Sequence, residues 1–441
     1  MKIAIIGTGY VGLPSGVGFA ELGNEVVCID KIAEKIEVLK AGRLTLFEEG
    51  LCELFKKNTA SGRLKFTTSM REGVRGADVV LIAVGTPPDP VTKAADLSFV
   101  YAAAEEMAEC LDGYTVICDK STVPVGTGDR VERLIREKNP QAEFDVVSLP
   151  EFLREGFAVH DFFNPDRVVI GTESERARAV LKKLYAPMAG KTQLLCVKRR
   201  SAETIKYASN SFLAMKIHYI NELANFCEHA GADIRDVALG IGLDSRIGPK
   251  FLNPGPGFGG SCFPKDTLAM DYMAREVGVD LTLIQSAISG NVLRKKLMAR
   301  RILKAASGVS KPRIAVLGIA FKGGTDDCRE SPAVDIVREL LLLGADNVVI
   351  FDPKAMDNAK KIFGDKVSFV PDAYAALEGA DVCAVLTEWK EFKDLDLARA
   401  KELMRRPVLE DLRNMLDPKK AQSLGFAYDC IGAAQGEKPA L

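Results

Sequence analysis

Cys262 is the cysteine whose neighbours best suit it to act as a nucleophile. It lies near the end of a glycine-dense stretch, residues 251–266, that reads FLNPGPGFGGSCFPKD. Such a density of glycine excludes regular structure and exposes backbone N–H groups to a bound ligand. Pro264 and the periodic run 267–274 predict a helix that begins just after the cysteine. Because the thiol stands beside a helix N-terminus and Lys265, we expect a lowered pKa and a reactive thiolate.

Three glycines near the N-terminus, Gly7, Gly9 and Gly12, have the GxGxxG spacing of a dinucleotide-binding turn. They follow a short apolar strand expected at 3–6 and open a helix. The glycines permit a tight turn, a close approach to a pyrophosphate and close packing of helix on sheet. The next strand ends at Asp30, whose carboxylate can accept a ribose hydroxyl and would repel a 2′-phosphate. The pattern therefore predicts NAD in preference to NADP.

Polar residues also follow three further apolar runs that we expect to be buried strands. Thr86, Thr122 and Glu151 stand after runs at residues 79–84, 115–118 and 145–149. In an open parallel sheet, ligands bind beyond the carboxyl ends of the strands, so these residues are candidates to face a cofactor or substrate. Glu155 follows Glu151 by one helical turn and could share its face. For a threonine before proline, such as Thr86, a plain turn residue stays an open alternative.

Lys206 and Asn210 lie four apart in a periodic segment from about Ser201 to Ala230, which predicts an unusually long helix. The spacing places both side chains on one helical face, where both could donate to a developing oxyanion. The residues alone leave open the alternative of a solvated face.

A second strand-and-helix pattern begins at 312–318, but it has no GxGxxG. Ser331 followed by proline predicts the start of its helix. Lys322, Arg329 and Arg413 lie in expected loops, where they could hold a phosphate. The tail after about Gly432 is expected to be disordered.

Composition limits the classes of function. The chain has 441 residues, 59 Lys plus Arg against 60 Asp plus Glu, and a formal net charge of −1. This balance argues against a nucleic-acid binder and a polybasic membrane protein, and no apolar stretch is long enough for a signal peptide or a membrane span. Ten cysteines without a CxxC pair and only three histidines predict reduced thiols, a cytoplasmic location and no metal site.

The length and the motifs predict an α/β fold of two doubly wound, Rossmann-like domains joined by a long central helix. We expect an NAD-binding domain at 1–200, a helical domain with the cysteine loop at 201–300, and a second Rossmann-like domain, able to hold a nucleotide phosphate, at 301–441.

An NAD fingerprint and an activated thiol together suggest oxidation of an alcohol to an aldehyde, its capture as a thiohemiacetal, and a second oxidation to a thioester that water hydrolyses. Two other classes share parts of this pattern. A two-electron β-hydroxyacid dehydrogenase needs no nucleophilic thiol, and a silent nucleotide-sugar sensor would need no Cys262, Lys206 or Glu151.

The chain resembles the UDP-glucose/GDP-mannose dehydrogenase family, and within it the UDP-glucose 6-dehydrogenases, to about residue 430. The resemblance rests on GTGYVG, VGTP, KSTVPVGT, PEFLREG, KYASN, the FLNPGPGFGGSCFPKD loop and AFKGGTDDCRESPA. It implies four-electron oxidation of UDP-glucose to UDP-glucuronate by a homodimer formed through the helical middle. It also implies that residues 201–300 form the dimerisation domain and that residues 301–441 bind the UDP-sugar.

The resemblance also implies roles for single residues. Cys262 would be the nucleophile, Lys206, Asn210 and Asp266 would surround the sugar C6, and Glu151 would activate water with the help of Thr122. The implied cofactor contacts are Gly7, Gly9, Tyr10, Val11, Gly12, Asp30, Lys35, Thr86, Thr122, Glu155, Lys265 and Arg329. The implied UDP-sugar contacts are Phe152, Leu153, Arg154, Glu155, Lys206, Asn210, Phe251, Leu252, Asn253, Gly257, Phe321, Lys322 and Arg413, with Arg246 reaching into a neighbouring subunit.

One position departs from the family pattern, because Leu412 stands where a glycine usually precedes the arginine at 413. This change could alter the turn that presents Arg413. The substrate is a second open point: GDP-mannose or a UDP-N-acetylhexosamine would undergo the same chemistry, although the form of the cysteine loop favours UDP-glucose.

Overall fold

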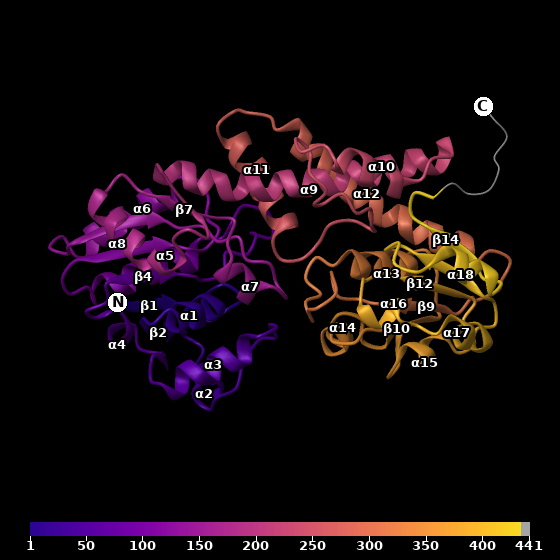
Figure 1. Cartoon of the computed structure of the whole chain (residues 1–441), viewed down its shortest axis with the longest axis horizontal. Coiled ribbons are helices and arrows are strands. Elements are labelled where there is room, and N and C mark those ends of the chain that lie inside the picture. Colours follow the sequence, from indigo (N-terminus) through magenta and orange to yellow (C-terminus); the bar gives the residue numbers. More distant parts are fainter. Residues whose placement is uncertain (434–441) are drawn as a thin grey trace. The chain divides into compact units, whose positions relative to one another are not determined.

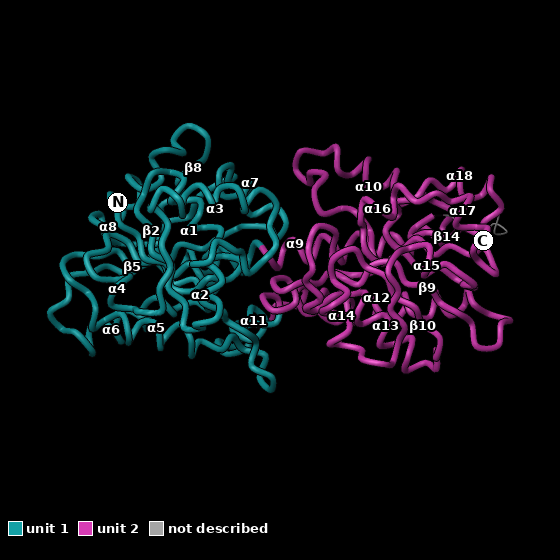
Figure 2. Tube along the Cα trace, turned by 90° about the horizontal axis from the view of Figure 1, so that it is seen from below, with its two compact units in different colours: residues 1–209, 268–279 teal, residues 210–267, 280–441 magenta. Residues whose placement is uncertain are grey.

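The computed structural model describes residues 1–433 and divides the chain into two compact units (Figure 2). Unit 1 comprises residues 1–209 and 268–279, and the described part of unit 2 comprises residues 210–267 and 280–433. The tail that is predicted to be disordered after about Gly432 lies, from residue 434 on, outside the described residues. The domain boundaries expected at 200 and 300 stay a prediction.

Unit 1 contains an eight-stranded sheet of order β3-β2-β1-β4-β5-β6-β7-β8. Figure 1 labels β1, β2, β4 and β7 of this sheet. Its strands are β1 (Lys2–Ile6), β2 (Glu25–Ile29), β3 (Leu64–Thr67), β4 (Val79–Ile82), β5 (Thr115–Asp119), β6 (Phe144–Ser148), β7 (Arg167–Gly171) and β8 (Gln193–Val197). Every neighbouring pair is parallel except β6 and β7, which are antiparallel. Alternate residues of β1 enter opposite cores, since Ile3 and Ile5 pack on one face of the sheet and Ala4 and Ile6 on the other.

Helices cover this sheet. They are α1 (Gly12–Glu21), α2 (Ala33–Lys40), α3 (Leu51–Ala60), α4 (Met70–Val74), α5 (Ser98–Ala108), α6 (Thr127–Lys138), α7 (Ala158–Phe163) and α8 (Glu175–Leu184), followed by a 3₁₀ turn at Ala186–Met188.

The predicted long helix is confirmed as α9 (Arg199–Ala230), which has 32 residues. Its residues up to 209 belong to unit 1 and the rest to unit 2. It is followed by α10 (Ile234–Gly242), α11 (Phe263–Glu276) and α12 (Thr282–Ala305). Helix α11 begins directly after Cys262, as the proline pattern predicts.

Unit 2 contains an all-parallel, six-stranded sheet of order β11-β10-β9-β12-β13-β14. Its strands are β9 (Ile314–Leu317), β10 (Val348–Phe351), β11 (Ser368–Phe369), β12 (Val382–Val385), β13 (Val408–Asp411) and β14 (Ala427–Cys430). Its helices are α13 (Pro332–Leu342), α14 (Met356–Phe363), α15 (Ala373–Leu377), α16 (Lys390–Lys393), α17 (Leu397–Leu403) and α18 (Pro418–Ser423), with a 3₁₀ turn at Gly364–Lys366. The predicted fold class, two doubly wound sheets with a long helix between them in the chain, is thereby confirmed.

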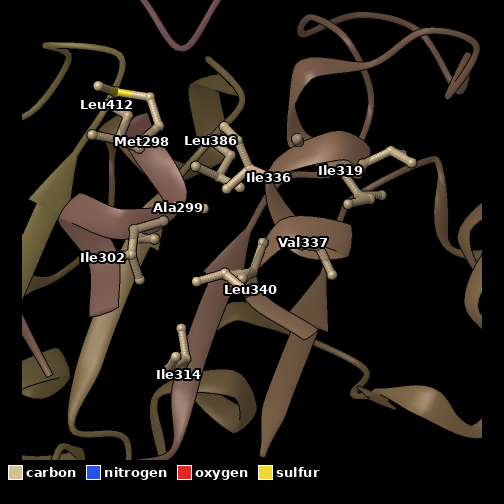
Figure 3. Close-up of a cluster of buried hydrophobic side chains, with 14 of the residues drawn as sticks. Met298, Ala299, Ile302, Ile314, Ile319, Ile336, Val337, Leu340, Leu386 and Leu412 are labelled. Atoms are coloured by element: carbon tan, nitrogen blue, oxygen red, sulfur yellow. The ribbon is translucent and has the colours of Figure 1, made fainter. Parts of the chain in front are cut away.

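Helix α12 packs into the core of this second sheet. Figure 3 shows Met298, Ala299 and Ile302 of α12 in one buried cluster with Ile336, Val337 and Leu340 of α13. Burial of this apolar surface is the main force that fastens the helices to the sheet. In the described part of the chain, no helix is both long and apolar enough to cross a membrane.

The second sheet has an acidic residue, Asp352, at the position that Asp30 takes in the first. Its Oδ2 accepts hydrogen bonds from Ile319 N at 2.8 Å, Ala320 N at 3.0 Å and Trp389 Nε1 at 3.1 Å. Its Oδ1 accepts from the backbone N–H groups of Lys354 and Ala355. The donors of the protein itself therefore satisfy this carboxylate.

Arg301 of α12 joins the helices to the end of the second sheet through three carboxylates. It lies 2.6 Å from Glu228 of α9, 2.9 Å from Glu410 of β13 and 2.8 Å from Asp429 of β14. Burial raises the pKa of Glu410 to about 7, although the charge of Arg301 opposes the rise. Because its folded-state pKa lies above its unfolded value, Glu410 lowers the stability progressively as the pH rises from 4.5 towards 7.

We expect Arg301→Met to lower the free energy of unfolding by about 3–5 kcal/mol, because it leaves three acidic groups in a largely buried place without their cation. The loss should be larger at about pH 8 than at about pH 5.5, where Glu410 can stay protonated. Urea denaturation at both pH values measures this loss in the free energy of unfolding. Arg300→Met, at the exposed neighbouring position, is the control; equal losses in both variants would contradict the role of the ion-pair network.

Candidate active site

The turn after β1 has the shape that a dinucleotide needs. Gly7 has φ +104°, and a Cβ there would lie 2.4 Å from Ala83 O, while a Cβ at Gly12 would lie 2.0 Å from Gly7 O. Both positions therefore require glycine. A Cβ at Gly9 would meet nothing within 4 Å, so this position faces open space. Tyr10 and Val11 complete the turn, and the N-terminus of α1 follows, where backbone N–H groups favour a diphosphate.

Asp30 follows β2, and three hydrogen bonds from Thr8 and Ile32 fix the orientation of its carboxylate. Its Oδ2 accepts from Thr8 N at 3.0 Å and from Thr8 Oγ1 at 2.6 Å, and its Oδ1 accepts from Ile32 N at 3.1 Å. Burial alone would raise the pKa of Asp30, but these hydrogen bonds and Lys35, whose Nζ lies 3.7 Å away, lower it. The carboxylate is thus ionised at neutral pH, which fits a ribose hydroxyl and opposes a 2′-phosphate.

The predicted threonines meet at the carboxyl edge of the first sheet. Thr86 Oγ1 donates to the backbone oxygen of Thr122 at 2.9 Å. Ser121, which precedes Thr122, donates through its hydroxyl to Val84 O at 2.7 Å. The loops after β4 and β5 are therefore tied together at the edge where ligands bind in such sheets.

Glu151 and Lys206 form a buried ion pair. Lys206 Nζ donates to Glu151 Oε1 at 3.0 Å, and Glu151 Oε2 accepts from Leu153 N at 2.6 Å. Burial would raise the pKa of Glu151, but the charges of Lys206 and Lys120 and the two hydrogen bonds lower it. The carboxylate therefore stays ionised although only 6% of its side chain is exposed.

Lys120 is a candidate that the sequence interpretation missed. It is buried, and burial lowers its pKa while Glu151 opposes the change. Its place directly after β5, in the KSTVP segment, was the signal that could have drawn attention to it.

The loop after β6 is fixed from several sides. The guanidinium of Arg167 lies 3.7 Å from the centre of the Phe152 ring, and Lys206 Nζ lies 5.2 Å from it. Glu48 accepts hydrogen bonds from Gly156 N at 2.9 Å and Ala158 N at 2.7 Å. These contacts hold the segment that contains Leu153, Arg154 and Glu155.

Arg154 itself is paired with Asp161. Its Nη2 donates to Asp161 Oδ1 at 2.6 Å and its Nε donates to Asp161 Oδ2 at 2.8 Å. Its side chain is 56% exposed, so it lies at the rim of this loop.

Asp266 organises the first turn of α11 in unit 2. It is 1% exposed; its Oδ2 accepts from Asn210 Nδ2 at 2.5 Å and its Oδ1 from Lys265 Nζ at 2.5 Å. Its backbone N–H donates to the oxygen of Cys262 at 2.8 Å. The predicted nucleophile, half-buried, thus lies one turn from a buried carboxylate that also orients Asn210.

The glycine-dense loop lies against the second sheet of the same unit. A Cβ at Gly259 would lie 2.3 Å from Glu330 O, and a Cβ at Gly260 would lie 2.7 Å from the Phe321 ring. Leu252 is buried and Asn253 is exposed. Phe251 has φ +65°, an uncommon conformation for a residue with a side chain. The loop therefore needs glycine where it approaches the 319–330 loop.

Arg413 connects three loops of unit 2. Its Nη2 donates to Phe321 O at 3.1 Å, its Nε donates to Leu386 O at 2.7 Å, and it lies 3.1 Å from Glu388. Leu412 is fully buried in the core, and the left-handed backbone conformation in this turn falls on Asn414, with φ +53°. Although Leu412 stands where the family usually has glycine, Arg413 remains in contact with the loop that contains Phe321.

Three other predicted residues lie nearer the surface of unit 2. Lys322 Nζ lies 5.4 Å from the ring of Phe321, and Arg329 is paired with Asp327 at 2.7 Å. Arg246 is paired with Asp244, and its side chain is 87% exposed.

Comparisons with known proteins identify the family of the chain. Models of the UDP-glucose/GDP-mannose dehydrogenase family match its NAD binding domain at residues 1–189, its central domain at 200–292 and its UDP binding domain at 315–418. The UDP-glucose 6-dehydrogenase of Rhizobium meliloti (strain 1021) is 50% identical over 98% of this chain and 99% of its own. TuaD, the UDP-glucose 6-dehydrogenase of Bacillus subtilis (strain 168), is 47% identical over 99% of this chain and 95% of its own.

Solved structures give the same result. A UDP-glucose dehydrogenase from Pyrobaculum islandicum superposes with a TM-score of 0.91 at 39% identity and covers 98% of both chains. A UDP-D-ManNAc dehydrogenase from Pyrococcus horikoshii has a TM-score of 0.86 at 29% identity and covers 98% of this chain and 99% of its own. The chain, which binds NAD through its first domain, belongs to the UDP-glucose/GDP-mannose dehydrogenase family.

Proposed function

We propose that this chain oxidises UDP-glucose to UDP-glucuronate through thiohemiacetal and thioester intermediates on Cys262. The overall reaction consumes one primary alcohol, two NAD⁺ and one water, and it yields one carboxylate, two NADH and three protons. The observation that carries the proposal is the position of Cys262 at the start of α11, one turn before the buried Asp266 that binds Asn210. The names of the relatives at 50% and 47% identity support the choice of substrate.

The thiol supplies the covalent steps. Cys262 Sγ forms a bond to C6 of the aldehyde, and the aldehyde oxygen becomes the hydroxyl of a thiohemiacetal. Bound NAD supplies the hydride acceptor for both oxidations. Water then attacks the thioester carbon, the C–S bond breaks, and the thiol is regenerated.

Asn210 and Lys206 are proposed to stabilise the negative charge that develops on the oxygen at C6. They lie one turn apart on α9. An amide nitrogen has two hydrogens, and the bond to Asp266 uses one of those on Asn210, which leaves the second for an oxyanion. Asp266 thereby fixes the direction in which this donor points.

Glu151 is proposed to activate the hydrolytic water, with Thr122 beside it at the same sheet edge. Its lowered pKa keeps it ionised, and it is therefore able to accept a proton at neutral pH. The bond from Lys206 holds the carboxylate in place.

A homodimer is proposed on the basis of an exposed apolar surface. Large apolar side chains are exposed on α9, α10 and α12: Phe212, Tyr219, Phe226, Leu239, Leu293 and Leu297. Two of them, Leu293 and Leu297, line a groove of about 380 Å³ between α9 and α12. Apolar patches of this kind mark protein–protein contacts, and a second copy would bury them.

We expect two NADH per UDP-glucose consumed, measured at the NADH absorbance against product quantified by chromatography. Cys262→Ser should abolish acid formation, because an alcohol side chain does not form the thioester under these conditions. Cys52→Ser, at an exposed cysteine, is the control and should keep full turnover. A yield of one NADH with released aldehyde, or full acid formation by the Cys262 variant, would refute the thioester route.

Glu151→Gln should slow thioester hydrolysis by about two to four orders of magnitude, the usual contribution of a general base. Rapid mixing should then show a burst of NADH followed by a slow steady state, and mass spectrometry should find substrate bound to Cys262. Glu173→Gln, at an exposed glutamate, should behave as the unchanged protein. A variant without a burst and with normal kcat would exclude Glu151 as the base.

A panel of UDP-glucose, UDP-N-acetylmannosamine and GDP-mannose decides between the substrates. The structural similarity to a UDP-D-ManNAc dehydrogenase makes the second sugar a real competitor. We expect kcat/KM to be highest for UDP-glucose; a preference for either other sugar would assign the same chemistry to a different substrate.

A further inference from the structure

Three buried polar side chains hold the glycine-dense loop 251–262, and none of them was singled out in the sequence. Asn221 lies on α9, and Asn291 and Arg294 lie on α12; their exposed fractions are 2%, 5% and 4%. Burying a polar side chain costs free energy unless its hydrogen bonds are made. All three make hydrogen bonds with the loop backbone.

Asn291 pairs with both backbone groups of a single loop residue. Its Oδ1 accepts from Phe258 N at 2.8 Å, and its Nδ2 donates to Phe258 O at 2.9 Å. The amide thus replaces the strand partner that an irregular segment lacks. Such a two-point contact fixes the orientation of the backbone as well as its position.

Asn221 and Arg294 fix the loop three residues earlier. Asn221 Oδ1 accepts from Gly255 N at 2.8 Å, and Arg294 Nε donates to Gly255 O at 3.0 Å. Arg294 Nη1 also donates to Asn221 O at 3.3 Å and to the side chain of Asn225. One network therefore joins two helices to the backbone at both ends of the segment 255–258.

Gly257, inside that segment, shows how closely the loop approaches α12. It has φ +134°, and a Cβ there would lie 2.7 Å from Asn291 Oδ1. The backbone can therefore reach Asn291 only because this residue is glycine.

We propose that Asn291, with Asn221 and Arg294, is a positioning residue: its amide sets the backbone at Phe258 and thereby the placement of Cys262 and of the adjoining UDP-sugar contacts. The inference rests on the proposed function of the loop. Asn291 acts through the backbone and touches none of the reacting atoms. A displacement of about 1 Å in a reacting group can cost about 100-fold in rate, so the effect should be large.

The first test is Asn291→Leu, which keeps the volume and removes both hydrogen bonds. We expect kcat/KM for UDP-glucose to fall about 10–100-fold while KM for NAD changes by less than about twofold. Alkylation of Cys262 by iodoacetamide, followed peptide by peptide by mass spectrometry, should change at least about threefold because the thiol is displaced.

The matched control is Asn58→Leu on α3 in unit 1. Asn58 is also fully buried, and its Nδ2 donates to Glu21 at 2.8 Å and to Leu54 O at 2.9 Å. Asn58→Leu should lower the melting temperature about as much as Asn291→Leu does. It should leave kcat/KM for UDP-glucose and the alkylation rate of Cys262 within about twofold of the unchanged protein. If the two variants lose kcat/KM equally, Asn291 serves stability alone and the proposal is wrong.

Asn291→Asp gives a second readout, which also applies if the leucine variant does not fold. A carboxylate keeps the acceptor for Phe258 N but repels Phe258 O, whereas a protonated carboxyl donates to that oxygen as the amide does. Because such a buried acid has a raised pKa, kcat/KM relative to the unchanged protein should rise at least about threefold between about pH 8 and about pH 6. A constant ratio would overturn the proposal.

Failure of the proposed function remains distinguishable from failure of this inference. Absence of UDP-glucose turnover in the unchanged protein would contradict the substrate assignment alone. The alkylation rate of Cys262 can be measured without substrate, so it still tests the positioning role of Asn291 in that case. An unchanged alkylation rate in Asn291→Leu would refute this role.

Discussion

The open carboxyl edge of a parallel sheet is the constraint on which this molecule depends. Strands covered on both faces leave little room for polar side chains, so those side chains collect where the strands end. In unit 1, Asp30, Thr86, Thr122 and Glu151 all stand beyond such ends. The hydrogen bond from Thr86 to Thr122 follows from this shared edge, because residues far apart in the chain are brought to one place. Lys206, from the long helix, supplies the positive charge that lets Glu151 stay ionised there.

The two sheets have the same residue types after their central strands, but the aspartates differ in their hydrogen bonding. Each has a glycine with a left-handed backbone after its first central strand and an aspartate after the next strand. Within residues 1–433, Asp30 accepts hydrogen bonds only from Thr8 and Ile32 and lies near Lys35, so it retains the capacity to accept a ribose hydroxyl. Asp352 already accepts five hydrogen bonds from its own protein. The second sheet must therefore recognise a ligand by other means, which agrees with its match to a UDP binding domain.

Local patterns made much of the fold and part of the site predictable. The glycine turn, Asp30 and the long helix depend on residues close together in the chain. Strand β8 was not predicted, because it is a half-exposed edge strand. Glu48 and Asn291 were missed for another reason. A single polar residue in a helix or loop is usually solvated, and only long-range contacts, such as the one between Glu48 and Gly156, 108 residues apart, reveal a buried partner.

The hydrogen bond between Trp389 and Asp352 makes the indole of Trp389 useful as a fluorescence probe. Trp389 is the only tryptophan of the 441 residues, and its indole is anchored beside the loop that leads from Ile319 to Phe321. All indole fluorescence of the protein therefore originates at one fixed location in the second sheet. The chain contains its own optical probe of that unit, and titrations with nucleotides can be followed by emission in the absence of any turnover, dye or label.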